Sequence, residues 1–176
     1  MIAMSHDDTR THDTDVIHLA EGLVGLPDLK RWVLLENDPP LPIRWLASLD
    51  RDGFRVPVTE PGWFDPDYAF ELDDRAERSL EAARAEDLAV LIVTTVGAGG
   101  ESVTGNLAAP IVVNIHSRKG LQYILDERKY SLHAEIDSVR FGLAIAETES
   151  DAVDSSMDSA APARYSEDGE PVLVEG

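Results

Sequence analysis

The sequence predicts a mainly β fold, an antiparallel β-barrel-like domain with one amphipathic helix. Short runs of β-branched, aromatic and other apolar residues recur through residues 16–146, and such runs between turns are typical of strands. The segments between them, such as Asp50-Arg-Asp-Gly53 and Asp65-Pro-Asp67, carry the residues that β-turns prefer. Many short strands at close spacing favour a barrel or a strongly bent antiparallel sheet.

The runs that predict strands follow one another along most of the domain. In chain order they are 16–19, 32–35, 44–49, 54–58, 68–72, 88–96, 102–104, 111–115, 121–125, 132–136 and 141–146. Pro57 lies inside one of them, and because proline has no amide hydrogen to donate, it indicates a strand edge or a bulge there.

A single helix is predicted after the fifth run. Asp74 and Glu77 form an Asp-x-x-Glu capping box, in which the first carboxylate accepts the amide of the third helical residue. Ala76, Leu80 and Ala83 follow at helical spacing and are expected to form its buried face.

The hairpin predicted at 111–125 contains a buried strand, a basic turn at residues 117–120 and a second strand. Gly120 is expected to supply the backbone freedom for the tight reversal. The apolar residues expected to fill the core from this region are Leu107, Ile111, Val113, Ile115 and Ile124.

The length of 176 residues suits one domain with a sizeable core. There is no cysteine, which excludes disulfides, thiolate catalysis and cysteine-based zinc sites. No apolar run approaches the ~20 residues of a membrane-spanning helix, and the first residues lack the basic start and apolar core of a signal peptide. We therefore expect a cytoplasmic protein with no membrane contact.

The net charge of −19 is unevenly distributed along the chain. Residues 1–15 hold four acidic and one basic side chain, residues 147–176 hold nine and one, and residues 16–146 hold 21 and 13. Because the two end segments have no hydrophobic period and few large apolar residues, they predict a disordered leader (1–15) and an acidic disordered tail (147–176). The folded domain is expected at 16–146.

This acidity disfavours direct binding to nucleic acid. An acidic domain can complement a basic protein partner, although the same charge also suits solubility alone.

Catalytic patterns find no support in the sequence. Gly97-Ala-Gly-Gly100 follows a predicted strand but no helix and no Gly-Lys-Ser/Thr come after it, so a hairpin loop is expected rather than a phosphate site. The five histidines have no metal-ligand spacing, and no serine lies in a nucleophile elbow. We expect neither an enzyme nor a bound metal or cofactor.

Four segments resemble the family of the flagellar assembly factor FliW. The most characteristic is Asn106-Leu-Ala-Ala-Pro-Ile-Val-Val-Asn114 with the basic turn and strand that follow it. Residues 20–36 are similar to the family's Gly-Leu/Ile-Pro-Gly-Phe entry, with Val24 in place of the proline and Leu26 in place of the phenylalanine. Residues 43–50 and 59–72 match two further family segments in the right order.

The resemblance implies a small, cytoplasmic, non-enzymatic, barrel-like protein with two protein partners. One implied partner is CsrA, a basic RNA-binding dimer that represses flagellin translation. The other is flagellin, which is captured before export through its helical end region. When flagellin leaves the cell, the freed protein would sequester CsrA, so that flagellin synthesis resumes. The protein is expected to be a monomer.

Six residues are predicted to contact a partner: Asn106, Asn114, Arg118, Gln122, Asp67 and Tyr68. Arg118 and Gln122 have no obvious folding role in the sequence, whereas the two asparagines are equally well explained as turn caps. Three alternatives remain open at this point: a small-molecule-binding β-barrel, an enzyme with an unrecognised site, and a structural acidic domain whose tail mediates contacts.

Overall fold

The computed structural model describes residues 15–36, 41–97, 102–139 and 141–142. The predicted leader (apart from Asp15), the acidic tail, residues 98–100 of the glycine-rich loop and residues 143–146 of the last predicted strand lie outside the described residues. The extent of the domain, 16–146, therefore stays a prediction.

The described residues include nine strands, an α-helix of seven residues and two 3₁₀ turns, as the mainly β prediction expected. The strands are β1 (Val16–Leu19), β2 (Arg31–Leu35), β3 (Arg44–Ser48), β4 (Arg55–Thr59), β5 (Leu88–Val96), β6 (Val103–Gly105), β7 (Ile111–Asn114), β8 (Lys119–Gln122) and β9 (Ala134–Glu135). The helix is α1 (Asp74–Leu80), and the 3₁₀ turns are η2 (Pro61–Trp63) and η3 (Ala85–Asp87).

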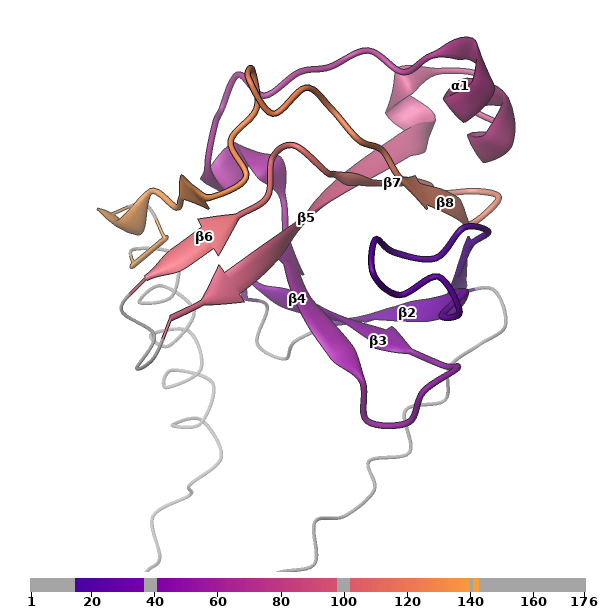
Figure 1. Cartoon of the computed structure of the whole chain (residues 1–176), viewed down its shortest axis with the longest axis horizontal. Helices are drawn as coiled ribbons and strands as arrows, with labels where there is room; N and C mark the ends of the chain where they lie inside the picture. The colour runs from indigo at the N-terminus through magenta and orange to yellow at the C-terminus, as the bar shows by residue number, and fades with distance from the viewer. Residues whose placement is uncertain (1–14, 37–40, 98–101, 140, 143–176) are drawn as a thin grey trace, which may run out of the picture.

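Seven of these strands close into a ring (Figure 1). The order β4-β3-β2-β1-β8-β7-β5 is completed by pairing of β4 with β5, while β6 and β9 extend from the far end of β5. All neighbours are antiparallel except β1 and β8, which run parallel. The antiparallel prediction is therefore wrong for this one pair, whose strands lie about a hundred residues apart in sequence and are not joined by a hairpin.

The interior of the ring is filled by apolar side chains. Trp32 is fully buried, and its indole nitrogen donates to the Leu29 carbonyl at 3.1 Å. Around it lie the other members of the core: Ile17, Leu19, Leu23, Leu29, Leu46, Val58, Leu91, Ile111 and Val113.

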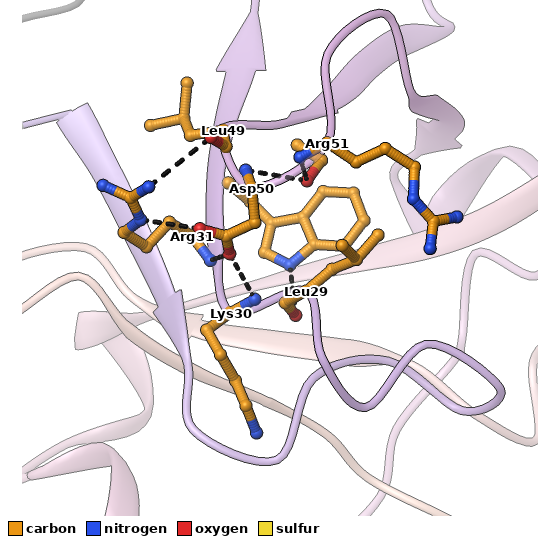
Figure 2. Close-up of polar contacts among 8 residues, drawn as sticks. Leu29, Lys30, Arg31, Leu49, Asp50 and Arg51 are labelled. Carbon is orange, nitrogen blue, oxygen red and sulfur yellow. Dashed lines mark hydrogen bonds and ion pairs between the residues drawn. The ribbon is translucent and has the colours of Figure 1, made fainter.

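Hydrogen bonds to the Asp50 side chain link the start of β2 to the turn between β3 and β4 (Figure 2). The Asp50 carboxylate accepts the backbone amides of Lys30 and Arg31 and the Arg31 side-chain Nε, each at 2.7 Å. These donors, the Arg31 amide and guanidinium foremost, lower the pKa of Asp50 from 3.8 to about 2. The turn is closed by Ser48, whose hydroxyl accepts the amides of Asp50 and Arg51.

The strand prediction is wrong for residues 68–72 and for residues 141–142, the described part of the last predicted strand. Residues 68–72 form no strand, because the strands beneath them already have ladder partners in the closed ring and offer no free edge. Phe141 and Gly142 are helical rather than extended.

Two further strands are shorter or shifted. The strand predicted at 121–125 runs from Lys119 to Gln122, and that predicted at 132–136 keeps only Ala134–Glu135. Pro57 pairs with Trp45 on one side and lies outside the β4–β5 ladder, as expected of a proline at a strand edge.

Helix α1 begins one residue earlier than the capping box predicts. Asp73, not Asp74, is the N-cap, and its carboxylate accepts the Ala76 amide at 2.7 Å. Ala76 and Leu80 are buried as predicted, but Ala83 lies beyond the helix end and is exposed. None of the described helices is long and apolar enough to cross a membrane.

Candidate partner-binding site

The turn between β7 and β8 is built by Asn114, one of the six predicted contact residues. Its side-chain Oδ1 accepts the amides of His116 at 2.8 Å and Ser117 at 3.1 Å, and its carbonyl accepts the Arg118 amide at 2.9 Å. Asn114 is itself buried, and its Nδ2 donates to the carbonyls of Leu80 and Glu81 at the end of α1. The side chain therefore shapes the turn and docks the helix.

The conformational prediction for Gly120 is wrong. Arg118, with φ 58°, takes the left-handed position in the turn, whereas Gly120 lies in β8 and pairs with both Leu19 and Val113. A Cβ on Gly120 would lie 2.7 Å from Leu19 Cδ2 and 3.2 Å from the Val112 carbonyl oxygen. Glycine is required here because three strands approach closely, and not because the chain reverses.

The basic side chains of this turn have acidic neighbours within the chain. The Arg118 guanidinium lies 3.8 Å from the Asp15 carboxylate, and Lys119 contacts Glu81. The Arg118 carbonyl also accepts the His18 amide, which joins the turn to β1. Arg118 is half-buried, so it remains within reach of a partner while it contributes to the fold.

Gln122 has a folding role that the sequence did not reveal. Its Oε1 accepts the Val24 amide at 2.7 Å and its Nε2 donates to the Ala109 carbonyl at 3.1 Å. Asn106 caps a neighbouring turn through its Oδ1, which accepts the Ala108 amide at 3.1 Å. The expectation that Gln122 lacks a structural task is thus wrong.

Gln122 and Asn106 line one shallow groove, which we call the Val24 groove, with a volume of about 420 Å³. Three exposed aliphatic side chains border it: Val24 (70% exposed), Ile124 (62%) and Leu132 (44%). Leu107, Ile111 and Val113 fill the core as predicted, but Ile124 and Ile115 face outward. Ile124 lies past the end of β8, where strand alternation no longer sets its direction.

The Val24 groove has a fixed backbone. The amides of Tyr123 and Leu125 donate to the carbonyls of Pro110 and Ala108, both at 2.8 Å. On the other side, Gly22 (φ 69°) turns the loop that carries Val24, and a Cβ at Gly22 would lie 2.4 Å from the Leu26 carbonyl oxygen. An exposed valine is therefore presented by a loop with little freedom to collapse.

Asp67 and Tyr68 lie in the segment that crosses from η2 to α1. Asp67 is exposed, and its amide donates to the Asp65 carboxylate in an Asx turn. Tyr68 is half-buried; its hydroxyl donates to the Leu107 carbonyl at 2.7 Å, and burial raises the pKa of its phenol.

An aromatic chain holds this segment in place. The ring of Tyr68 contacts those of Tyr130 and Phe70, with centroids 5.7 and 5.6 Å apart, and Phe70 stacks on Tyr123 at 6.1 Å. The hydroxyl of Tyr130 donates to the Ala69 carbonyl. Tyr68 therefore helps to hold residues 68–72 against the rest of the domain.

The six predicted residues occupy three places rather than one. Asn114 and Arg118 share a turn, Asn106 and Gln122 share the Val24 groove, and Asp67 and Tyr68 lie on the segment before α1. The exposed aliphatics of the Val24 groove were missed, although Val24 between Gly22 and Gly25 was the available signal. Across the described residues, no group of three His, Asp or Glu side chains is placed to hold a metal ion.

Comparison with known proteins gives a consistent result. The family model described as FliW protein matches residues 3–136. The flagellar assembly factor FliW of Caldicellulosiruptor bescii is 33% identical over 120 residues, which cover 68% of this chain and 78% of that protein. That of Thermosipho africanus is 31% identical over 131 residues, covering 74% and 90%. A crystal structure of the flagellar assembly factor FliW superposes with a TM-score of 0.66 at 30% identity, over 71% of this chain and 87% of that one.

Proposed function

The chain belongs to the FliW family of flagellar assembly factors, and on that premise we propose that it switches between two protein partners. In the cytoplasm it binds flagellin as a chaperone, and it binds CsrA, which prevents CsrA from repressing flagellin translation. The observation that carries this proposal is the match to the family over residues 3–136. The surface of the described residues supports it in two further ways.

The first support is the Val24 groove. A helix with one apolar face is recognised when that face packs into an apolar groove, and the end region of flagellin is expected to be such a helix. Val24, Ile124 and Leu132 offer exposed aliphatic surface over a fixed backbone. We assign the flagellin contact to this groove, with Asn106 and Gln122 as its polar border.

The second support is charge. Residues 16–146 carry 21 acidic and 13 basic side chains, which complements a basic dimer such as CsrA. Steered association between opposite charges slows as salt screens them, over a Debye length of about 8 Å at physiological ionic strength. The association rate with CsrA is therefore expected to fall as salt is raised, and an undetectable complex at micromolar protein would contradict this half of the proposal.

The alternative of a small ligand inside the ring finds less support. The interior is occupied by Trp32 and the aliphatic core around it. The Val24 groove is an open surface feature, and such a surface suits a protein segment better than an enclosed metabolite.

A mutational test of the flagellin contact uses exposed aliphatic residues. Val24→Asp and Ile124→Asp place charge in the groove and are expected to weaken flagellin binding by about tenfold or more, because burying one such side chain contributes about 1.5–3 kcal/mol. Val139→Asp is the matched control, since Val139 is 73% exposed and is not among the groove residues. Binding by titration calorimetry that falls equally for all three variants would exclude the groove as the contact.

The switch itself is tested by adding both partners. Flagellin is expected to lower the affinity for CsrA, and CsrA to lower the affinity for flagellin by the same factor. If each partner binds with unchanged affinity in the presence of the other, there is no coupling free energy and no switch.

A further inference from the structure

We infer that a second groove, between residues 68–72 and α1, binds an amphipathic segment of a basic protein partner. This groove, which we call the Phe70 groove, has a volume of about 590 Å³. Its lining is mostly apolar, with Phe70, Leu72, Leu88, Val90 and Val112 among the larger side chains. This inference rests on the proposed function in one respect: it takes the partner to be a basic protein.

The floor of the Phe70 groove is the outer face of the sheet. Ile111 and Val113 of β7 point into the ring, so Val112 and Asn114 point to the opposite face. Asn114 bonds to the end of α1 and Val112 lies at the bottom of the groove. Val90 pairs with Val112 in the neighbouring strand, which extends the apolar floor to β5.

One wall is held rigidly without a sheet ladder. The Phe70 ring is stacked on Tyr123 and contacts Tyr68, and the Tyr130 hydroxyl holds the Ala69 carbonyl at 2.8 Å. Figure 1 shows this segment running along the top of the view, above the loop that follows β8, before it enters α1. A preformed groove needs little ordering on binding, which favours affinity.

The border of the Phe70 groove is acidic. Glu71 and Glu77 line it and are exposed, whereas the one basic lining residue, Arg84, lies 3.7 Å from Glu86. Residues 71–87 hold seven acidic and three basic side chains, a net −4 that is half of the −8 carried by residues 16–146. The excess charge of the domain is therefore concentrated beside this groove.

The apolar floor and the acidic border together indicate which kind of ligand the Phe70 groove binds. Apolar side chains suit the floor, and lysine or arginine residues on the same segment suit Glu71 and Glu77. An anionic lipid surface would be repelled by the acidic border. A second copy of the chain would bring its own residues 71–87 and the same net negative charge to the contact.

The experiment uses the full chain and a fluorescein-labelled peptide of leucine and lysine, with the leucines at helical spacing. Fluorescence anisotropy is expected to show saturable binding, which weakens when glutamine replaces lysine in the peptide. Glu71→Lys with Glu77→Lys is expected to weaken binding about tenfold at low salt. The double variant Asp28→Lys with Asp52→Lys has the same net charge, changes exposed acids outside the groove, and is expected to stay within about twofold of the parent.

A second variant tests the apolar part. Ala83 is exposed, lies beyond the end of α1 and lines the Phe70 groove, so Ala83→Trp fills the groove without removing a core contact. Loss of peptide binding with unchanged thermal unfolding supports the inference. Unchanged binding by Ala83→Trp, or equal weakening by the two double charge variants, overturns it.

Other occupants give distinct results. Peptide binding lost in Val24→Asp but kept in Ala83→Trp would place the segment in the Val24 groove and overturn the inference. The inference would also be overturned if sedimentation velocity showed that the parent is a dimer and that Ala83→Trp is a monomer, because a second copy of the chain would then occupy the groove. CsrA serves as a second ligand. If CsrA binds equally well to the parent and to the Glu71→Lys, Glu77→Lys variant, the Phe70 groove is rejected but the proposed function is kept. If the peptide binds and CsrA does not, the groove is kept and the CsrA half of the proposed function is rejected.

Discussion

Two corners of the ring are each held by one polar side chain, but their environments are opposite. Asn114, at the β7–β8 turn, is buried and neutral and makes four side-chain hydrogen bonds to backbone groups. Asp50, in the turn between β3 and β4, is charged and near solvent, and it accepts three hydrogen bonds from Lys30 and Arg31 at the start of β2 (Figure 2).

Burial determines how much each of these two side chains contributes to stability and whether that contribution depends on pH. A buried amide leaves several backbone groups without water when it is lost, so its removal is costly at every pH. A solvent-accessible carboxylate can be partly replaced by water, and its contribution depends on its ionisation. The side chain that joins α1, the β7–β8 turn and the sheet is therefore an amide, Asn114, which does not titrate.

The largest expected effect is that of Asn114→Ala. It removes the partners of the Leu80 and Glu81 carbonyls and of the His116 and Ser117 amides, so it should destabilise the protein by about 2–3 kcal/mol. Chemical denaturation measures this loss. Asn106→Ala, which removes one bond from a half-buried side chain, should cost about 1 kcal/mol or less, and equal losses would show that burial does not separate the two asparagines.

Gln122→Ala comes next, with a loss of about 1 kcal/mol. The variant cuts the bonds to Val24 and Ala109 that join two sides of the Val24 groove. Gln122→Glu keeps the acceptor for the Val24 amide but not the donor, so its melting temperature should lie between those of the parent and Gln122→Ala. If Gln122→Ala melts at the same temperature as the parent, Gln122 does not contribute to stability and only the predicted partner contact remains for it.

Asp50→Asn should have a smaller effect that depends on pH. The folded-state pKa of Asp50, about 2, lies below its ordinary value of 3.8, so its stabilisation is present above about pH 4 and is lost as pH falls toward 2. The difference in unfolding free energy between parent and variant should therefore shrink over that range. Asp52→Asn, at an exposed position in the same turn, is the control, and a difference that does not change with pH would mean that the tie is not ionic.

The smallest change is expected from Thr94→Val. The Thr94 hydroxyl is buried without a hydrogen-bond partner among the described residues, so replacing it with a methyl group of the same shape should be neutral or slightly stabilising, within about 0.5 kcal/mol. Thr59→Val is the contrast, since the Thr59 hydroxyl donates to the Pro42 carbonyl at 2.6 Å, and it should cost about 1 kcal/mol. A clear loss in Thr94→Val would reveal a partner for that hydroxyl.

The sequence predicted more of the fold than of the surface. Short β-rich runs located β1, β2 and β7 closely, because β-branched and aromatic residues between turns favour strands and all three runs contribute buried residues to the core. Residues 68–72 show an equally β-like pattern, but alternate apolar residues also serve a segment fixed by the Tyr68 and Phe70 rings. The local sequence pattern does not distinguish a segment that pairs with a strand from one that is held by contacts between aromatic rings.

The site residues show the same limit. Asn114 was predicted with turn capping and partner contact as equal choices, and its burial beside Leu80 decides that it caps. Gln122 looked free of structural tasks because its partners, Val24 and Ala109, lie 98 and 13 residues away in sequence. Its contact with a partner stays a prediction.

By itself the sequence determined the β-rich class, the family and the acidity of the chain, since these follow from residue composition, short-range pattern and motif order. The closing pair β4–β5, the parallel pair β1–β8 and the need for glycine at position 120 emerged only in the tertiary structure. The same holds for the two grooves, whose walls come from segments far apart in the chain. The physical reason is that burial and hydrogen-bond satisfaction are set by what packs against a residue, and a chain's sequence neighbours are seldom its neighbours in space.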